Sequence, residues 1–214
     1  MAKQKIKILV ATTNPGKMAE LSAMLDLDVD WLSLSDFPDV PQVAEDGQTF
    51  QENARKKALG YAKATGLWTI ADDSGLVIDA LDGAPGVKSA RFSGEPAPHQ
   101  ERCLIDYRNC AKVLDLLKDV PTEKRTARFV CSLCLAKSEE ILIETQGKLE
   151  GVIAQSPAGC NGFGYDPIFF VPSVGRNVAQ LGSEEKNAIS HRGNAIRKLK
   201  PLLAKLLETA DYAD

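Results

Sequence analysis

A short apolar run, residues 67–71, leads directly into two adjacent aspartates, Asp72 and Asp73, and then into Ser74 and Gly75. The run has the length and composition of a buried strand. Two neighbouring carboxylates are costly near a core, because like charges repel each other and lose their hydration there. The sequence therefore predicts a strand that ends with this run and carboxylates in a tight loop at its end, where ligands gather in α/β folds.

Two explanations of this acidic loop remain open at this point. A hard divalent cation such as Mg²⁺, which prefers oxygen ligands, would neutralise the two carboxylates. A solvated turn in which an aspartate caps its own backbone would account for the same residues without any ligand.

Composition limits the class of protein. A chain of 214 residues that is 44% hydrophobic can bury a sizeable core, and we expect a single domain over residues 1–214, divided at most into two lobes. The net charge of −3 offers no broad basic surface for a nucleic-acid polymer. No apolar run is long enough to span a membrane, and the apolar run near the N-terminus, residues 8–11, is too short for a secretory signal. We therefore expect a soluble, cytoplasmic protein.

The five cysteines do not form the even set typical of a disulfide framework. Cys131 and Cys134 resemble a C-x-x-C motif, but residues 127–136 have a strand pattern. Two residues three positions apart on a strand point to opposite faces, so redox or zinc chemistry is not expected there.

Strand and helix patterns alternate in the N-terminal half, which indicates an α/β fold. Strands are expected at residues 5–11 and 29–34, and a helix with the stripe Met18, Leu21, Met24 and Leu25 lies between them. Thr49 and Glu52 form a capping box at the start of a second helix, which ends before Gly66.

The C-terminal half is expected to add a helix, a hairpin and a long final helix. The first helix covers residues 98–118 and turns Leu104, Val113, Leu114 and Leu117 inward. Residues 125–136 and 141–146 predict a hairpin that could form a second sheet region. The final helix opens at Ser190, carries a kink at Pro201, and buries Ala195, Ile196, Leu199, Leu202, Leu203, Leu206 and Leu207.

Residues 12–17 form a polar turn between the first strand and the first helix. Free backbone N–H groups, the helix dipole and Lys17 would together attract an anion. The turn is not a P-loop, because the first glycine is missing and Met18 replaces the residue that should hold Mg²⁺. An ordinary βα turn with a surface lysine explains the same residues.

Four further features are compatible with a ligand site. Glu45 precedes the helix that leads into the acidic strand end, so it could supply a second carboxylate or lie in an exposed loop. Arg91 follows a turn-rich segment. Residues 163–167 combine glycine and aromatic residues suited to stacking on a base, or form a β-bulge. His191 and Arg192 lie at a helix start, off its apolar stripe, where such residues are commonly solvated.

Six motifs in order strongly resemble the inosine/xanthosine triphosphate pyrophosphatase family. They are T-x-N-P-G-K, E-D-G-x-T-F-x-E-N-A, A-D-D-S-G-L, G-A-P-G-V-x-S-A-R-F-S-G, G-F-G-Y-D-P-I-F and E-K-N-A-I-S-H-R-G. The resemblance extends over about residues 8–199. Two positions depart from the family pattern: Thr13 replaces a frequent glycine, and Cys160 replaces a frequent serine or threonine.

The resemblance implies an enzyme that hydrolyses deaminated purine nucleoside triphosphates (ITP, dITP and XTP) to the monophosphate and pyrophosphate and so removes them from the nucleotide pool. It also implies an elongated mixed β-sheet flanked by helices, with two lobes and the active-site groove between them. Mg²⁺ is the implied cofactor, and a homodimer is the implied assembly.

The family motifs also imply a role for individual residues. Asp73 resembles the proton acceptor for the attacking water, and Glu45 and Asp73, with Asp72 close by, resemble the Mg²⁺ ligands. The implied substrate contacts are Thr12, Thr13, Asn14, Pro15, Gly16, Lys17, Ser74, Arg91, Phe163, Gly164, Tyr165, Asp166, Lys186, His191 and Arg192. Of these, Phe163 to Asp166 are similar to a base platform, His191 and Arg192 to the pair that reads the purine, and Lys186 to a triphosphate contact.

Two alternatives are weighed against this interpretation. One is a triphosphate pyrophosphatase for other bases, such as dTTP or UTP, although the sequence Ser190-His191-Arg192 suits a purine with a 6-oxo group. The other is a non-catalytic nucleotide-binding protein, which could dispense with Glu45 or Asp73.

Overall fold

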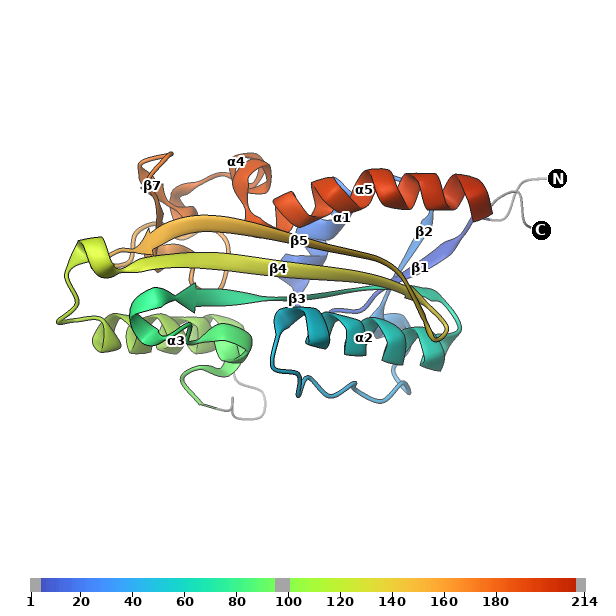
Figure 1. The fold of residues 1–214 in the computed structure, drawn as a ribbon, viewed down its shortest axis with the longest axis horizontal. Helices are drawn as coiled ribbons and strands as arrows, with labels where there is room; N and C mark the ends of the chain where they lie inside the picture. The colour runs from blue at the N-terminus through green and yellow to red at the C-terminus, as the bar shows by residue number, and fades with distance from the viewer. Residues whose placement is uncertain (1–4, 95–100, 211–214) are drawn as a thin grey trace. The chain divides into compact units, whose positions relative to one another are not determined.

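The computed structural model describes residues 5–94 and 101–210. Seven strands form one sheet in the order β2-β1-β3-β4-β5-β6-β7 (Figure 1). β1 pairs in parallel with β2 and β3, whereas β6 pairs antiparallel with β5 and β7, so the sheet is mixed. The strands are β1 (Lys7–Val10), β2 (Asp30–Ser33), β3 (Trp68–Ile78), β4 (Thr126–Lys137), β5 (Glu140–Ile153), β6 (Phe169–Val171) and β7 (Arg176–Asn177).

Five α-helices accompany the sheet in the described part of the chain. They are α1 (Pro15–Met24), α2 (Phe50–Thr65), α3 (Arg102–Leu116), α4 (Ser183–Ile189) and α5 (His191–Ala210). Strands and helices alternate in the N-terminal half as the sequence predicts, which confirms the α/β class with a mixed sheet.

The chain forms two compact units, each assembled from separate segments. Unit 1 comprises Met1–Asp73, Cys131–Gly147 and Arg192–Asp214, and unit 2 comprises Ser74–Val130 and Lys148–His191. β3, β4 and β5 each contribute residues to both units. Every contact described below lies within one unit.

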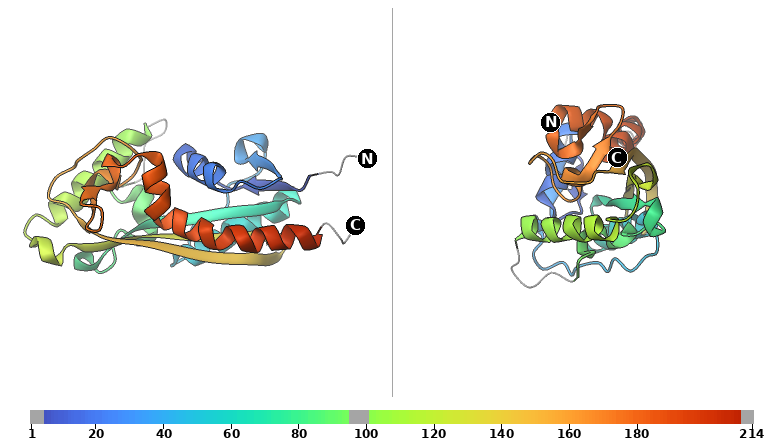
Figure 2. Two further views of the ribbon diagram at one scale, coloured as in Figure 1. Left: turned by 90° about the horizontal axis from the view of Figure 1, so that it is seen from above. Right: turned by 90° about the vertical axis from the view of Figure 1, so that its left-hand side faces the viewer.

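Unit 1 buries both faces of its strands. Ile8 and Val10 of β1 pack with residues of α1 and α5 on one face, while Leu9 and Ala11 pack with α2 on the other. Figure 1 and Figure 2 show α5 and α2 on opposite sides of these strands. Because strand side chains alternate between faces, each residue of β3 in this unit meets either the α1 and α5 layer or the α2 layer.

Unit 2 has a core of its own. Leu76 and Ile78 of β3 pack with Cys110, Val113 and Leu117 of the α3 region. Phe129 of β4 stacks on Phe169 of β6, with 4.3 Å between the ring centroids.

The structure corrects the prediction that a strand ends before Asp72. β3 continues without interruption from Trp68 to Ile78, so Asp72 and Asp73 lie inside a strand rather than in a loop. Both aspartates are buried. Their charges are matched by basic side chains from distant segments, which a local interpretation of the sequence cannot see.

The α2 cap is confirmed with one change. The Thr49 hydroxyl accepts a hydrogen bond from the Glu52 amide, and Gly66 ends the helix with a φ of 71°. The Glu52 carboxylate, however, accepts from the backbone amide of Gln48 instead of that of Thr49.

In α3, the predicted inward face is wrong at Leu104. This side chain is 42% exposed, and Ile105 takes its place in the interior, while Val113 and Leu117 are buried as predicted. Of the helix predicted over residues 98–118, the first three positions lie outside the described residues.

β4 and β5 form the predicted hairpin, with the turn at Ser138 and Glu139. Both strands belong to the single sheet instead of a second sheet region. Cys131 and Cys134 belong to different core clusters on opposite faces, as predicted. Burial raises the pKa of each thiol to about 12, so both remain protonated at neutral pH.

At the C-terminus, a short helix that was not predicted, α4, precedes α5. α5 contains Pro201 and buries Leu199 and Leu203, whereas Leu202 is 48% exposed and the prediction for it is wrong. Across residues 5–94 and 101–210, no helix combines the length and the apolar character needed to cross a membrane.

Candidate active site

Asp72 and Asp73 point to opposite faces of β3, and each meets a separate group of partners in unit 1. Asp72 lies on the face covered by α1 and α5, where it contacts Lys17 and Arg192. Asp73 lies on the α2 face, where it contacts Asn53 and Lys57. The alternation of strand side chains thus separates two like charges that are adjacent in sequence.

Asp72 anchors a buried charge network. Its Oδ1 lies 2.9 Å from the Lys17 ammonium, and its Oδ2 lies 3.0 Å from Nη2 of Arg192. Arg192, only 1% exposed, also donates from Nη1 to the Glu20 carboxylate. Burial alone would raise the pKa of Asp72, but the charges of Lys17 and Arg192 outweigh burial and hold it well below its usual value.

Asp73 belongs to a second cluster, which brings it together with Glu45. The Lys57 ammonium lies 2.9 Å from Glu45 Oε2 and 3.5 Å from Asp73 Oδ1. The Asn53 carboxamide donates to Asp73 Oδ2 at 3.1 Å. Burial raises the pKa of Asp73 above its usual value, although Lys57 and Lys17 act in the opposite direction. Burial would lower the pKa of Lys57, but Asp73, Asp72 and Glu45 together raise it.

The donor set of this second cluster fits a hard divalent cation. Two carboxylates, Glu45 and Asp73, already contact one cationic group, the Lys57 ammonium. Mg²⁺ is commonly held by one or two carboxylates together with substrate phosphates and water. No group of three or more His, Cys, Asp or Glu side chains in the described part of the chain is arranged to hold a metal. Asp72 is bound to Lys17 and Arg192 on the other face of β3, so we do not assign it to the cation.

The polar turn at residues 12–17 caps α1 with its own side chains. Asn14 Oδ1 accepts from the amides of Gly16 and Lys17 at 2.9 and 3.3 Å, and Thr12 Oγ1 accepts from the Asn14 amide. Pro15 occupies the first turn and has no amide hydrogen. An anion at this turn would therefore meet side-chain donors, such as those of Thr12, Asn14 and Lys17, rather than the capped amides.

In unit 2, Phe163, Asp166 and Lys186 form one cluster. The buried Lys186 ammonium lies 2.7 Å from Asp166 Oδ2 and 4.4 Å from the centre of the Phe163 ring. The same Asp166 oxygen accepts from the Phe163 amide at 2.9 Å. Lys186, assigned by resemblance to the triphosphate, thus lies with the residues assigned to the base.

His191 and Arg192 are buried, not solvated at the helix start. The His191 ring stacks on Phe129 in unit 2, with 4.8 Å between the ring centroids and 20° between the planes. Arg192 belongs to the Asp72 network of unit 1. The off-stripe position of these residues in α5 gave no indication of this burial.

The remaining predicted substrate residues differ in their burial. Thr13 and Arg91 are exposed, and Ser74 is half-buried in β3. Tyr165 is buried, and its hydroxyl donates to the Ser89 carbonyl oxygen at 2.8 Å. Gly164 has a φ of 64°, in the left-handed region that glycine adopts readily.

Three residues that the sequence analysis missed take part in these clusters: Glu20, Asn53 and Lys57. Asn53 and Lys57 lie four positions apart on the buried face of α2. Two polar residues on an otherwise apolar helix face are a signal that could have been recognised. Glu20 had no comparable signal, because it lies on the partly exposed α1.

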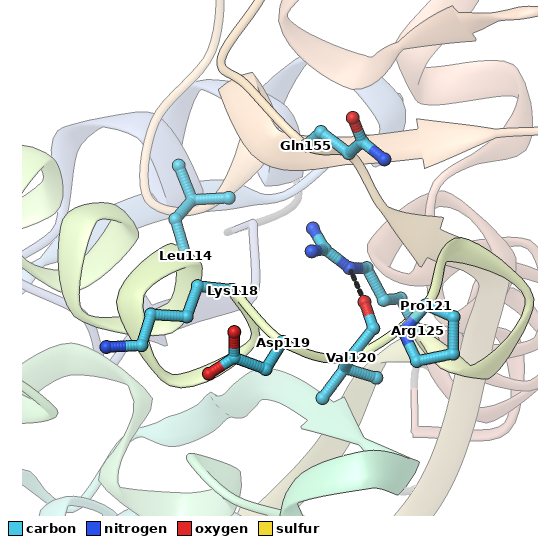
Figure 3. Close-up of a pocket in the computed structure, with 7 residues that line it drawn as sticks. All are labelled: Leu114, Lys118, Asp119, Val120, Pro121, Arg125 and Gln155. Atoms are coloured by element: carbon cyan, nitrogen blue, oxygen red, sulfur yellow. Dashed lines mark hydrogen bonds between the residues drawn. The ribbon is translucent and has the colours of Figure 1, made fainter.

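A pocket of about 520 Å³ lies in unit 2 and is lined by Leu114, Lys118, Asp119, Val120, Pro121, Arg125 and Gln155 (Figure 3). None of the predicted substrate or metal residues lines it. Arg125 donates to the carbonyl oxygens of Val120 and Leu117 at 2.9 and 2.8 Å. It thereby caps the C-terminal end of α3, which is a structural role.

The fold and these clusters define an α/β protein whose first unit combines a polar βα turn, lysines and a carboxylate pair suited to phosphate and a divalent cation. The sequence pattern of the Ham1 family matches residues 8–202, and the chain belongs to this family. This result confirms the resemblance carried by the six motifs.

Individual relatives and solved structures also match most of this chain. A protein of Geobacter sulfurreducens named dITP/XTP pyrophosphatase is 53% identical over 91% of this chain and 94% of its own length. A HAM1 protein from Coxiella burnetii is similar in structure, with a TM-score of 0.83, 43% identity, and coverage of 94% of this chain and 99% of that one. A nucleoside-triphosphatase / dITP/XTP pyrophosphatase from Mycobacterium abscessus has a TM-score of 0.73, 46% identity, and coverage of 92% and 100%.

Proposed function

We propose that this protein hydrolyses deaminated purine nucleoside triphosphates, including dITP and XTP, to the monophosphate and pyrophosphate. Relatives named dITP/XTP pyrophosphatase support the proposal, because they match nearly the whole chain at 45–53% identity. The side chains of each unit support the same chemistry.

The observation that carries the proposal is the convergence of Glu45 and Asp73 on one cationic group, Lys57. We assign these carboxylates to Mg²⁺, which would neutralise charge on the phosphates when bound. Asp73 would also accept the proton of the attacking water, since burial raises its pKa and a more basic carboxylate is a better proton acceptor. Asn53 and Lys57 would orient Asp73 by hydrogen bonding to its two oxygens.

We assign the triphosphate to the polar turn of unit 1. Lys17, with the hydroxyl of Thr12 and the carboxamide of Asn14, would contact phosphate oxygens. Charge-assisted hydrogen bonds of this kind position the α-phosphorus and stabilise the charge that develops on the leaving pyrophosphate.

We assign the base to Phe163 and its neighbours, and its 6-oxo group to His191 and Arg192. A guanidinium donates hydrogen bonds only, so it suits the O6 acceptor of hypoxanthine and xanthine and opposes the amino group of adenine. Asp72 and Glu20 both bind the Arg192 guanidinium and would hold it in a fixed orientation.

A homodimer belongs to the same proposal and is supported by the family resemblance alone, and a cytoplasmic location is proposed from the sequence patterns. Sedimentation of the purified protein at several concentrations would measure its mass and decide the assembly.

The test of the function is pyrophosphate release from dITP, XTP, GTP, ATP and dTTP, with Mg²⁺ and with a chelator. We expect Mg²⁺-dependent release that is fastest for dITP and XTP. Glu45→Gln should weaken the affinity for Mg²⁺, so that more metal is needed for half-maximal rate, while Glu139→Gln, on an exposed turn, serves as the control. Fastest release from dTTP, or release that is unchanged by the chelator, would contradict the proposal.

A further inference from the structure

Helix α3 carries buried polar side chains on the face that it turns toward the interior of unit 2. Asp106, Asn109 and Cys110 are 8%, 1% and 5% exposed. Helix faces that pack into a core are normally apolar, so polar groups at these positions require partners. Their partners are the backbones of two segments that the sequence analysis assigned to the substrate.

Asp106 and Cys110 hold both polar groups of one residue, Gly164. The Gly164 amide donates to Asp106 Oδ2 at 2.7 Å, and the Cys110 thiol donates to the Gly164 carbonyl oxygen at 3.4 Å. Asp106 and Cys110 are one helical turn apart, so they lie on the same face of α3. Burial raises the pKa of the Cys110 thiol to about 12, which keeps its proton in place.

Asn109 holds the second segment. Its Nδ2 lies 3.3 Å from the carbonyl oxygen of Ser89, and its Oδ1 accepts from the Ser93 amide at 2.8 Å. Tyr165 donates to the same Ser89 carbonyl oxygen. The segment that carries Arg91 and the segment that carries Phe163 are therefore joined through α3.

Gly164 is the point at which this support matters most. It lies between Phe163 and Tyr165 and has a left-handed φ of 64°. A glycine in a loop has wide conformational freedom, so its orientation depends on the groups that bind its amide and carbonyl. The hydrogen bond that the Asp106 carboxylate accepts from the Gly164 amide is charge-assisted and short, which makes it the stronger of the two.

We propose that Asp106 is a positioning residue that fixes the Gly164 peptide and thereby orients the Phe163 ring for stacking on the purine. The inference rests on the proposed function, because it takes Phe163 to Asp166 as the base platform. Asp106 does not contact the substrate, and it acts through the backbone of Gly164. Asp106 also forms an ion pair with Arg102, whose Nε lies 3.1 Å from Asp106 Oδ1 and whose side chain is half exposed. Arg102→Ala removes this ion pair without removing Asp106, and it therefore serves as the matched control.

The first experiment measures amide hydrogen exchange at Gly164 without nucleotide, in wild type, Asp106→Ala, Asp106→Asn and Arg102→Ala. We expect exchange about tenfold faster in Asp106→Ala, from the loss of a hydrogen bond to a charged acceptor. Asp106→Asn keeps an acceptor oxygen and should stay closer to wild type, and Arg102→Ala should match wild type. Unchanged Gly164 exchange in Asp106→Ala would overturn the inference. This result does not depend on catalysis, so it separates the inference from the proposed function.

The second experiment measures KM and kcat for dITP and GTP in the same proteins, after thermal unfolding has shown that each is folded. For Asp106→Ala we expect a KM for dITP raised about tenfold, with kcat within about threefold of wild type. The preference for dITP over GTP should fall, and Asp106→Asn should restore most of it. An equal loss of kcat on both substrates with unchanged KM would show a purely structural role and overturn the inference. A wild type that hydrolyses neither substrate would refute the proposed function, and the Gly164 exchange would still decide the role of Asp106.

Discussion

Replacing Asp72 by asparagine tests the buried charge network of unit 1. Asp72 is 2% exposed and binds both the Lys17 ammonium and the Arg192 guanidinium, and Arg192 is 1% exposed. Asparagine keeps the shape and one acceptor oxygen but removes the negative charge. Arg192 would keep its contact with the Glu20 carboxylate, whereas both cations would lose the negative charge of Asp72.

Removing one partner of a buried ion pair typically costs about 3–5 kcal/mol, because the other charge stays buried without compensation. Since Arg192 retains Glu20, we expect the lower end, about 3 kcal/mol. The assay is urea denaturation, monitored by tryptophan fluorescence. The two tryptophans, Trp31 and Trp68, both lie in unit 1, so the signal reports on the unit that contains the network.

The pH dependence gives a second result from the same proteins. The pKa of Asp72 is lowered in the folded state, so its stabilisation is complete above the unfolded value of about 3.9 and is lost as the pH falls toward the folded value. The difference in unfolding free energy between wild type and Asp72→Asn should therefore narrow below about pH 4.

Asp79→Asn is the matched control, because Asp79 is an exposed carboxylate that binds Thr126 and Arg128. The free energy of unfolding of Asp79→Asn should lie within about 1 kcal/mol of the wild-type value. If Asp72→Asn lowers the free energy of unfolding no more than the control does, the argument is refuted. It is also refuted if the difference between wild type and Asp72→Asn does not change between pH 7 and pH 3.

The other predictions concern single side chains of the candidate site. Lys17→Ala should lower kcat/KM by an amount equivalent to about 1.5–3 kcal/mol, equally for dITP and GTP, because phosphate contacts do not depend on the base; a loss on only one substrate would assign Lys17 to the ring. Arg192→Ala should lower kcat/KM for ITP and XTP much more than for ATP, and an equal loss on all three would remove it from base recognition. Gly162→Ala would place a Cβ 2.0 Å from Asp166 Oδ2 and should lower the free energy of unfolding by about 1–3 kcal/mol more than Gly175→Ala does. Gly175 is the control because it has a similar positive φ and nothing within 4 Å of an added Cβ. Equal shifts in melting temperature for the two variants would contradict the steric argument.

Local patterns predicted most of the secondary structure, because caps and hydrophobic periodicity act over a few residues. Thr49 and Gly66 marked the ends of α2, and the apolar strand patterns located β1 and β4. The error at Leu104 has the same origin. Leu104 and Ile105 are adjacent apolar residues, and periodicity alone does not decide which of them faces the core.

The clusters of the candidate site could not be predicted in the same way. Asp72 remains inside a strand because Lys17 and Arg192, far away in sequence, neutralise it. Arg192 was expected at the surface for the same reason, since its partner Asp72 lies 120 positions earlier. The sequence showed that charged residues were present, but only the three-dimensional structure shows which of them compensate one another.

The central claim is that water attacks the α-phosphorus of the nucleotide, with Asp73 as the proton acceptor. The most direct measurement is hydrolysis of dITP in water enriched with oxygen-18, followed by mass spectrometry of both products. Attack at the α-phosphorus predicts that the label enters dIMP and that pyrophosphate remains unlabelled. Label in pyrophosphate, or formation of a nucleoside diphosphate with labelled phosphate, would place the attack on another phosphorus and contradict the account.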